Sequence, residues 1–269
     1  MKKFEGMILA CDMDGTLLND DRQISQGNQQ ALRYFTQEGG RFSLATGRAP
    51  QAIQPYIPQM PFNAPYSLLN GSLILDSSHH VLHCAGMPED TKDLIRITLS
   101  EFSQIGCEIF VGNRVLIRRM SPETEHHIKV LDLEYSMVTQ ESLGNTAEWC
   151  KINFTGKPEQ MENVRTFLKP YTDRFCMASS MPAFCEITAS GINKGSALKQ
   201  IAADCGIAEN HIFAIGDSYN DEAMLQAAHI GFAPSNSDED ILRTADVVVC
   251  SNNEDAVAQA IEYMEAHYC

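Results

Sequence analysis

Aspartates follow two apolar stretches of the chain, one near each end. Asp12 and Asp14 come directly after the apolar run Met7–Cys11, and Asp217 follows the run "IFAIG". Residues i and i+2 of a strand face the same side, so we expect Asp12 and Asp14 to begin on one face at the carboxyl end of a strand. Such carboxylates repel each other unless a cation or a proton lies with them. Because Mg²⁺ takes oxygen ligands and keeps waters for a substrate phosphate, these acids favour a magnesium site.

Each acidic group also has an ordinary structural explanation. Asp-Gly pairs are common in surface turns, which would account for Asp14 and Gly15. Asp217 could cap the helix that follows it, with Asp221 as an early acid in that helix. Capping explains one aspartate, but it does not readily explain matched acids after apolar strands in both halves of the sequence.

Further residues suit an anionic substrate. In "LATGR", Thr46 and Gly47 lie between a predicted strand and a helix, where free backbone N–H groups can bind phosphate. Lys194 starts a late helix, and the helix dipole disfavours a cation there, which indicates a fixed anionic partner. A lone lysine is more often simply solvated. Arg48 fits catalysis and a surface ion pair equally well.

The elements around these residues predict the fold class. Strands are expected at Met7–Cys11, in "RFSLATGR" and in "YSLLNGSLILD", with a helix capped by Ser25 between the first two. The same alternation returns in "HIFAIGD", "HIGFA" and "DVVVC". This order predicts an α/β fold with a doubly wound, mainly parallel sheet.

The middle of the chain has a different pattern. "CEIFVGNRVLIRR" predicts a hairpin that turns at Gly112-Asn113, and a helix from Pro158 to Leu168 is followed by two further strands. We therefore predict an inserted α+β domain at residues 84–187, with residues 1–83 and 188–269 forming one discontinuous core domain. The chain crosses between the core domain and the insert near Gly86 and Gly191, and these two glycines are expected to act as hinges.

Charge and cysteine content indicate which binding partners and which cellular compartment to expect. Acidic residues outnumber basic ones 35 to 20 over 269 residues, for a formal charge of -15. Such a surface repels nucleic acid and anionic membranes. No apolar stretch reaches the roughly 18 residues of a membrane span. The nine cysteines are scattered without a C-x-x-C pair, which predicts reduced, buried thiols in a cytoplasmic protein.

Four motifs together carry a family resemblance. "DMDGTLL", "LATGR", "INKGSAL" and "GDSYNDEAML", in this order, resemble the motifs of the haloacid dehalogenase-like (HAD) superfamily. The position of the insert, with "LLNGSLI" after the second motif, resembles the Cof-type phosphatases, which have an α+β cap of type C2B. Dehalogenases of the superfamily lack the second aspartate, so Asp14 points to phosphoryl transfer.

The resemblance implies a role for each matching residue. Asp12 would attack phosphorus to form an aspartyl-phosphate, and Asp14 would act as general acid and then general base. Asp221 would hold Lys194 or a metal-bound water, and Arg48 would lie at the rim of the site. The implied Mg²⁺ ligands are Asp12, the backbone carbonyl of Asp14, and Asp217. The implied phosphate-binding groups are the backbone N–H of Met13, Thr46, Gly47, Lys194 and Asn220.

Three functions are compatible with these motifs. The first is a Mg²⁺-dependent phosphatase of small organic phosphate esters, such as sugar phosphates or phosphorylated cofactors, without a nucleic-acid or membrane partner. The second is a phosphomutase that moves phosphate within a sugar. The third is a binding or regulatory protein that keeps the fold without turnover, which the full set of catalytic residue types disfavours.

Overall fold

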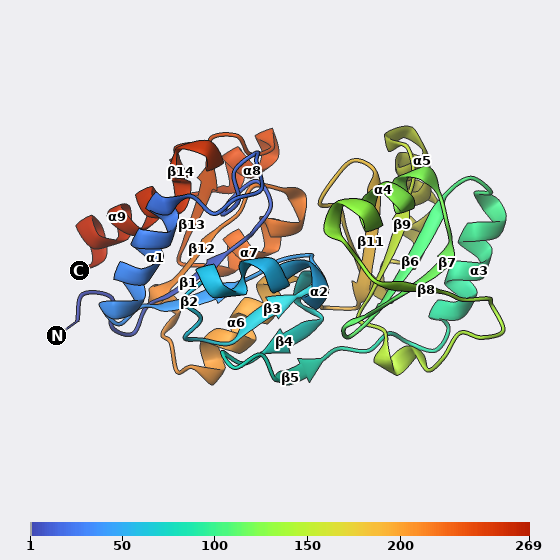
Figure 1. Ribbon diagram of the computed structural model, residues 1–269, viewed down its shortest axis with the longest axis horizontal. Coiled ribbons are helices and arrows are strands. Elements are labelled where there is room, and N and C mark those ends of the chain that lie inside the picture. The colour runs from blue at the N-terminus through green and yellow to red at the C-terminus, as the bar shows by residue number, and fades with distance from the viewer. Residues whose placement is uncertain (1) are drawn as a thin grey trace. The chain divides into compact units, whose positions relative to one another are not determined.

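The computed structural model describes residues 2–269, and the contacts between its residues divide the chain into two compact units (Figure 1). The first unit contains the N-terminal segment to Gly47, Pro55–Leu82 and Asn193–Cys269. The second contains Arg48–Gln54 and His83–Ile192. The insert expected at residues 84–187 falls within the second unit, which also takes the short segment after Gly47.

A five-stranded parallel sheet forms the centre of the first unit, in the order β14-β13-β12-β1-β2. Its strands are β1 (Ile8–Cys11), β2 (Arg41–Leu44), β12 (Ile212–Ile215), β13 (Ile230–Pro234) and β14 (Val247–Val249). Strand β1 lies between β2 and β12, so the two acidic strand ends predicted from the sequence belong to neighbouring strands. The expected α/β fold with a parallel sheet is confirmed.

Helices cover both faces of this sheet (Figure 1). They are α1 (Gln26–Gln37), α6 (Lys194–Asp204), α7 (Glu222–Ala227), α8 (Glu239–Thr244) and α9 (Ala256–Tyr268). Ile8 and Ala10 of β1 share an apolar cluster with Leu198 of α6, whereas Phe213 of β12 packs on Tyr268 of α9, with ring centroids 5.0 Å apart. Because strand residues alternate between faces, residue 12 continues toward the α6 side.

The third predicted strand does not join the parallel sheet. It forms a separate sheet of β3 (Tyr66–Leu68), β4 (Leu73–Leu75) and β5 (Val81–Cys84), and a single bridge from Ser67 to Ala45 links it to the chain after β2. Leu69 and Asn70 have φ values of 53° and 56°. These left-handed residues reverse the chain, so that β4 returns antiparallel to β3.

The second unit is an α+β structure around a six-stranded sheet, in the order β10-β11-β9-β6-β7-β8. The strands are β6 (Gly106–Val111), β7 (Arg114–Arg119), β8 (Tyr135–Met137), β9 (Lys151–Thr155), β10 (Phe175–Ala178) and β11 (Phe184–Ala189). The hairpin at Gly112-Asn113 and the helix α5 (Pro158–Leu168) have the predicted positions.

Three elements of the second unit were not predicted from the sequence: α3 (Thr91–Glu101), α4 (Pro122–Leu131) and β8. The buried residues of α3 include Leu94, Ile95, Thr98 and Leu99, which have the spacing of a helix face. The β-branched residues among them favour strands and so obscure the helical pattern. The remaining helix, α2 (Pro50–Ile53), is only four residues long.

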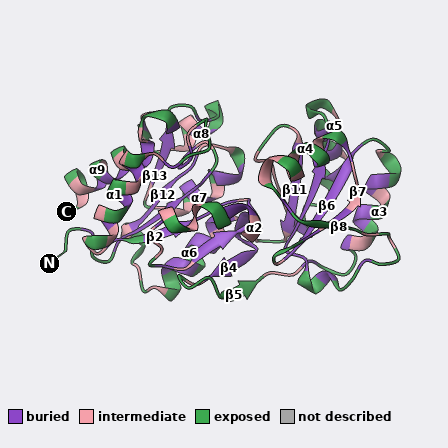
Figure 2. Cartoon of the chain, in the orientation of Figure 1, coloured by how far each residue is buried: buried purple, intermediate pink, exposed green. Residues whose placement is uncertain are grey.

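Each unit has its own apolar core, and buried residues concentrate in the strands of both sheets (Figure 2). The core of the second unit includes the tryptophan Trp149, which is 1% exposed. Between residues 2 and 269, no helix has both the length and the apolar content needed to cross a lipid bilayer.

Candidate active site

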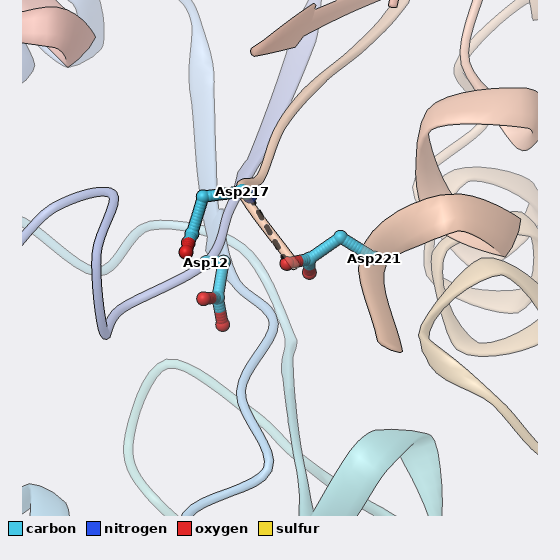
Figure 3. Close-up of side chains that lie close together, drawn as sticks. All are labelled: Asp12, Asp217 and Asp221. Atoms are coloured by element: carbon cyan, nitrogen blue, oxygen red, sulfur yellow. Dashed lines mark hydrogen bonds between the residues drawn. The ribbon is translucent and has the colours of Figure 1, made fainter. Parts of the chain in front are cut away.

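The parallel sheet brings Asp12 and Asp217 to the same edge. Cys11 pairs with Ile215 in the register of β1 and β12, and the backbone N–H of Asp12 donates to the carbonyl of Ile215 at 2.9 Å. Asp217 follows β12 by two residues, and Asp221 approaches from the next turn (Figure 3). One carboxylate oxygen from each of these three aspartates lies within 4.8 Å of the others.

Lys194 bonds to two members of the acidic cluster, Asp12 and Asp221. The side chain of Asn193 accepts a hydrogen bond from the backbone N–H of Ser196 and so fixes the start of α6, with Lys194 as its first residue. Its Nζ lies 2.6 Å from Oδ1 of Asp12 and 2.7 Å from Oδ1 of Asp221. The lysine side chain is fully buried, which is tolerated because both carboxylates compensate its charge.

Asp221 already accepts hydrogen bonds on both carboxylate oxygens. Oδ1 accepts from Lys194, and Oδ2 accepts from the backbone N–H groups of Asp217 and Ser218 at 3.2 and 3.1 Å. Figure 3 marks the bond that ties Asp221 to the backbone of Asp217. Asp221 therefore orients both the lysine and the loop that carries Asp217.

Asp217 is held by the turn that follows β1. The hydroxyl of Thr16 donates to Oδ1 of Asp217 at 2.6 Å. Gly15 has a φ of 73°, and a Cβ at this position would lie 2.4 Å from Oδ2 of Asp217. Only glycine combines this backbone conformation with such a close approach, so the "DGT" segment is shaped around the Asp217 carboxylate.

The electrostatics of the cluster fit a divalent cation. Three carboxylates and one ammonium group leave two formal negative charges at the edge of the sheet. Burial and the nearby Asp221 raise the pKa of Asp217 to about 7, and burial likewise raises the pKa of Asp12 although Lys194 opposes this. Burial alone would lower the pKa of Lys194, but Asp12 and Asp221 outweigh it and raise that pKa. The cluster thus keeps an excess of negative charge, which a bound cation would neutralise.

Asp14 lies beside this cluster and is exposed to solvent. Its charge contributes to the raised pKa of Asp217, so the two carboxylates are near each other. The side chain of Met13 is buried, and its carbonyl accepts from the N–H of Leu18 at 2.8 Å. This bond closes the turn that contains Asp14.

The predicted phosphate-binding residues Thr46 and Asn220 are linked through Asn70, which the sequence analysis did not identify as a site residue. The N–H of Asn70 donates to the carbonyl of Thr46 at 3.1 Å, and Asn220 Nδ2 donates to Asn70 Oδ1 at 3.2 Å. Asn70 Nδ2 and Asn220 Oδ1 are buried without a hydrogen-bond partner in the described part of the chain. Since buried polar atoms are usually paired, these two amides suit a polar ligand. The feature of the sequence that could have indicated Asn70 is the Asn-Gly pair in "LLNGS".

The remaining predicted residues are Gly47 and Arg48. Gly47 is half-buried and directly follows Thr46 at the end of the first segment of its unit. Arg48 belongs to the second unit, where it is 6% exposed and its Nη1 donates to the carbonyl of Ala52 at 3.0 Å. The position of Arg48 at the rim of the site stays a prediction.

The chain belongs to the haloacid dehalogenase-like hydrolase family, whose sequence model matches residues 9–261. The resemblance inferred from the four motifs is thereby confirmed, and the chain is a hydrolase of this superfamily.

Relatives of known name agree with this assignment. The chain is similar to 5-amino-6-(5-phospho-D-ribitylamino)uracil phosphatase YcsE of Bacillus subtilis, with 28% identity over 95% of this chain and 94% of the relative. Phosphatase YwpJ of the same organism is 27% identical, over 96% and 99% of the two chains. A solved haloacid dehalogenase-like hydrolase from B. subtilis superposes with a TM-score of 0.85 at 25% identity, covering 100% of both chains.

Proposed function

We propose that this hydrolase removes phosphate from small organic phosphate monoesters, with Asp12 as the nucleophile and Mg²⁺ as the cofactor. The buried contact between Asp12 and Lys194, at the strand end that also carries Asp217, is the observation that supports this most directly. It gives a carboxylate whose charge is partly balanced and whose position is fixed, as a nucleophile requires.

The metal would be held by the carboxylates of Asp12 and Asp217 and by the backbone carbonyl of Asp14. Both oxygens of Asp221 are already engaged, which favours an orienting role for this residue over direct ligation. The excess negative charge of the cluster suits a divalent ion with oxygen ligands. When bound, Mg²⁺ would offset the repulsion between the anionic nucleophile and the phosphate.

The protein residues divide the reaction into two displacements. Asp12 attacks phosphorus and forms an aspartyl-phosphate while Asp14 gives a proton to the departing alcohol oxygen. Asp14 then takes a proton from the water that hydrolyses the aspartyl-phosphate. The exposure of Asp14 is compatible with exchange of protons with solvent.

Donors around Asp12 would hold the phosphoryl oxygens. We assign this role to the Lys194 ammonium, the Asn220 amide and the Thr46–Gly47 segment, with the backbone N–H of Met13. Asn70 would orient this set, because it bonds to both Thr46 and Asn220. Fixed donors aimed at a phosphoryl group are the main source of rate acceleration in phosphoryl transfer.

The substrate class is the small phosphorylated metabolites, meaning sugar phosphates or phosphorylated cofactors. The printed name of the B. subtilis relative YcsE describes a phosphorylated ribityl compound, which belongs to this class. The formal charge of -15 disfavours nucleic acids as substrates.

A phosphate-release screen tests this function. Purified protein is assayed with sugar phosphates, pyridoxal phosphate, flavin mononucleotide and nucleotides, with Mg²⁺ or after chelation. We expect Mg²⁺-dependent release from several small monoesters and none from Asp12→Asn protein free of deamidated material. Transfer of phosphate within a sugar, seen only with a bisphosphate activator and without net phosphate release, would indicate a phosphomutase. Neither release nor transfer with any ester would indicate a binding protein.

A further inference from the structure

Two cysteines of the second unit lie together although they are 66 residues apart in the sequence. The sulfur atoms of Cys84 and Cys150 are 3.0 Å apart, close enough for a hydrogen bond between the thiols. Cys84 is exposed and Cys150 is buried. A disulfide requires the sulfurs at about 2.05 Å, so a shift of about 1 Å would allow the bond to form.

Backbone contacts hold the two cysteine segments side by side. The N–H of Met87 donates to the carbonyl of Thr146 at 3.0 Å. A Cβ on Gly86 would lie 2.1 Å from the carbonyl oxygen of Ala147, so the absence of a side chain at Gly86 permits this approach. The N–H of Cys150 is itself bonded to the carbonyl of Phe110 at 2.8 Å. The proximity of the sulfurs thus follows from the path of the chain, not only from a side-chain rotamer.

The environment also distinguishes the two sulfurs in reactivity. The hydrogen bond from Cys150 lowers the pKa of Cys84 to about 7, although partial burial opposes this. By contrast, the same hydrogen bond and burial raise the pKa of Cys150. Because the thiolate is the reactive form of cysteine, Cys84 is the accessible nucleophile and Cys150 is the thiol placed to react with its oxidised product.

We propose that Cys84 and Cys150 form a redox-active dithiol whose oxidant is a hydroperoxide. The Cys84 thiolate attacks one peroxide oxygen, the O–O bond breaks, and Cys84 becomes a sulfenic acid while the leaving oxygen takes a proton. The Cys150 sulfur then bonds to the Cys84 sulfur, and the hydroxyl leaves as water with the proton of Cys150. With hydrogen peroxide, two thiols lose two electrons and the peroxide becomes two waters.

The oxidised form would fasten the start of the insert to its own sheet. Cys84 is the last residue of β5, two residues beyond Leu82, the last residue of the first unit's second segment. Cys150 directly precedes β9. The bond would therefore fix one of the two chain crossings expected to flex. Formation of this disulfide does not depend on the proposed phosphatase reaction, because the oxidation state of the thiols can be measured directly.

Peptide mapping of the full-length protein tests the dithiol. Reduced protein, freed of reductant, receives increasing amounts of hydrogen peroxide and is then alkylated and digested. We expect a linked peptide pair joining Cys84 to Cys150, lacking two hydrogen atoms and restored by dithiothreitol. It should form before the exposed Cys269 loses its reactivity, and it should persist in the control variant Cys269→Ser.

The variant Cys150→Ser separates the two steps. It should convert Cys84 to a sulfenic acid that dimedone captures, with no linked pair. Oxidation of Cys269 before either member of the pair would overturn the proposal. So would overoxidation of Cys84 in the unmodified sequence with Cys150 still alkylated. The mapping of the unmodified protein decides the question even if Cys150→Ser fails to fold.

Discussion

Lys194 and Asp12 form a buried ion pair, 2.6 Å from Nζ to Oδ1, although 182 residues separate them in the chain. The pair joins the start of α6 to the end of β1. Because a buried charge must be compensated, the lysine also bonds to Asp221. The site is therefore organised before any substrate binds, with the carboxylate that we propose as the nucleophile already positioned by a cation.

Replacing this lysine should damage both activity and stability. We expect Lys194→Met to lower kcat by about 10²–10³-fold, the usual effect of losing one fixed donor to a transition state. It leaves Asp12 and Asp221 without their buried partner, so the free energy of unfolding should fall by about 3–5 kcal/mol. Steady-state kinetics and urea unfolding measure these changes. Lys199→Met, on the exposed face of the same helix, is the matched control, and equal behaviour of the two variants would contradict the role of Lys194.

Asp221 should affect the metal through its neighbours. We expect Asp221→Asn to weaken Mg²⁺ activation by about 10–100-fold, as is common when an orienting partner of a ligand is lost. The amide cannot both neutralise Lys194 and accept the two backbone N–H groups as the carboxylate does. Activity is measured against Mg²⁺ concentration, with Asp204→Asn on α6 as a control. An unchanged Mg²⁺ requirement would show that Asp221 does not orient the site.

The metal-free protein should lose stability as pH rises. The carboxyl of Asp217 has its pKa raised to about 7 by burial and Asp221, whereas in the unfolded chain it titrates near about 3.9. Between these values the folded state binds more protons, so the free energy of unfolding falls with increasing pH. Urea unfolding in a chelator should show a smaller loss for Asp217→Asn than for the unmodified protein between about pH 4 and pH 8. If the free energy of unfolding fell equally with pH in both proteins, the raised pKa of Asp217 would be contradicted.

Gly15 offers a steric test of the Asp217 position. Gly15→Ala places a methyl group 2.4 Å from Oδ2 of Asp217 at a φ of 73°. Gly206→Ala has a similar φ of 66° but meets no atom within 4 Å. Both should cost about 1 kcal/mol for the left-handed backbone, and only Gly15→Ala should also weaken Mg²⁺ activation. If both variants kept the same Mg²⁺ requirement, Gly15 would not shape the metal site.

The acidic edge of the sheet was predictable because it depends on local rules. Apolar strands followed by Asp12 and Asp217 indicated strand ends, and parallel pairing brings such ends to one edge of a sheet. The sequence also supplied the start of α6, since Asn193 and Ser196 form a capping pair there.

Other features depend on long-range contacts that no local pattern records. Asn70 connects Thr46 to Asn220 through a reversal of the chain at two left-handed residues. Strand order alone had suggested that β3 belongs to the parallel sheet, but β3 pairs with β4 in a separate sheet, with a bridge from Ser67 to Ala45. The cysteines were expected to be buried, but Cys84 and Cys269 are exposed. The proximity of Cys84 and Cys150 over 66 residues has no signature in the spacing of the sequence.

The central claim is that Asp12 carries the phosphoryl group during turnover. Borohydride reduces an acyl phosphate to an alcohol, so it should convert phosphorylated Asp12 to homoserine when added during hydrolysis of p-nitrophenyl phosphate. Because p-nitrophenolate departs without a proton, Asp14→Asn should slow mainly the second displacement and raise the yield of reduced Asp12. Peptide mass spectrometry should find homoserine at position 12 only when substrate and Mg²⁺ are both present. Turnover with Asp12 unreduced, or reduction at another aspartate, would contradict the account.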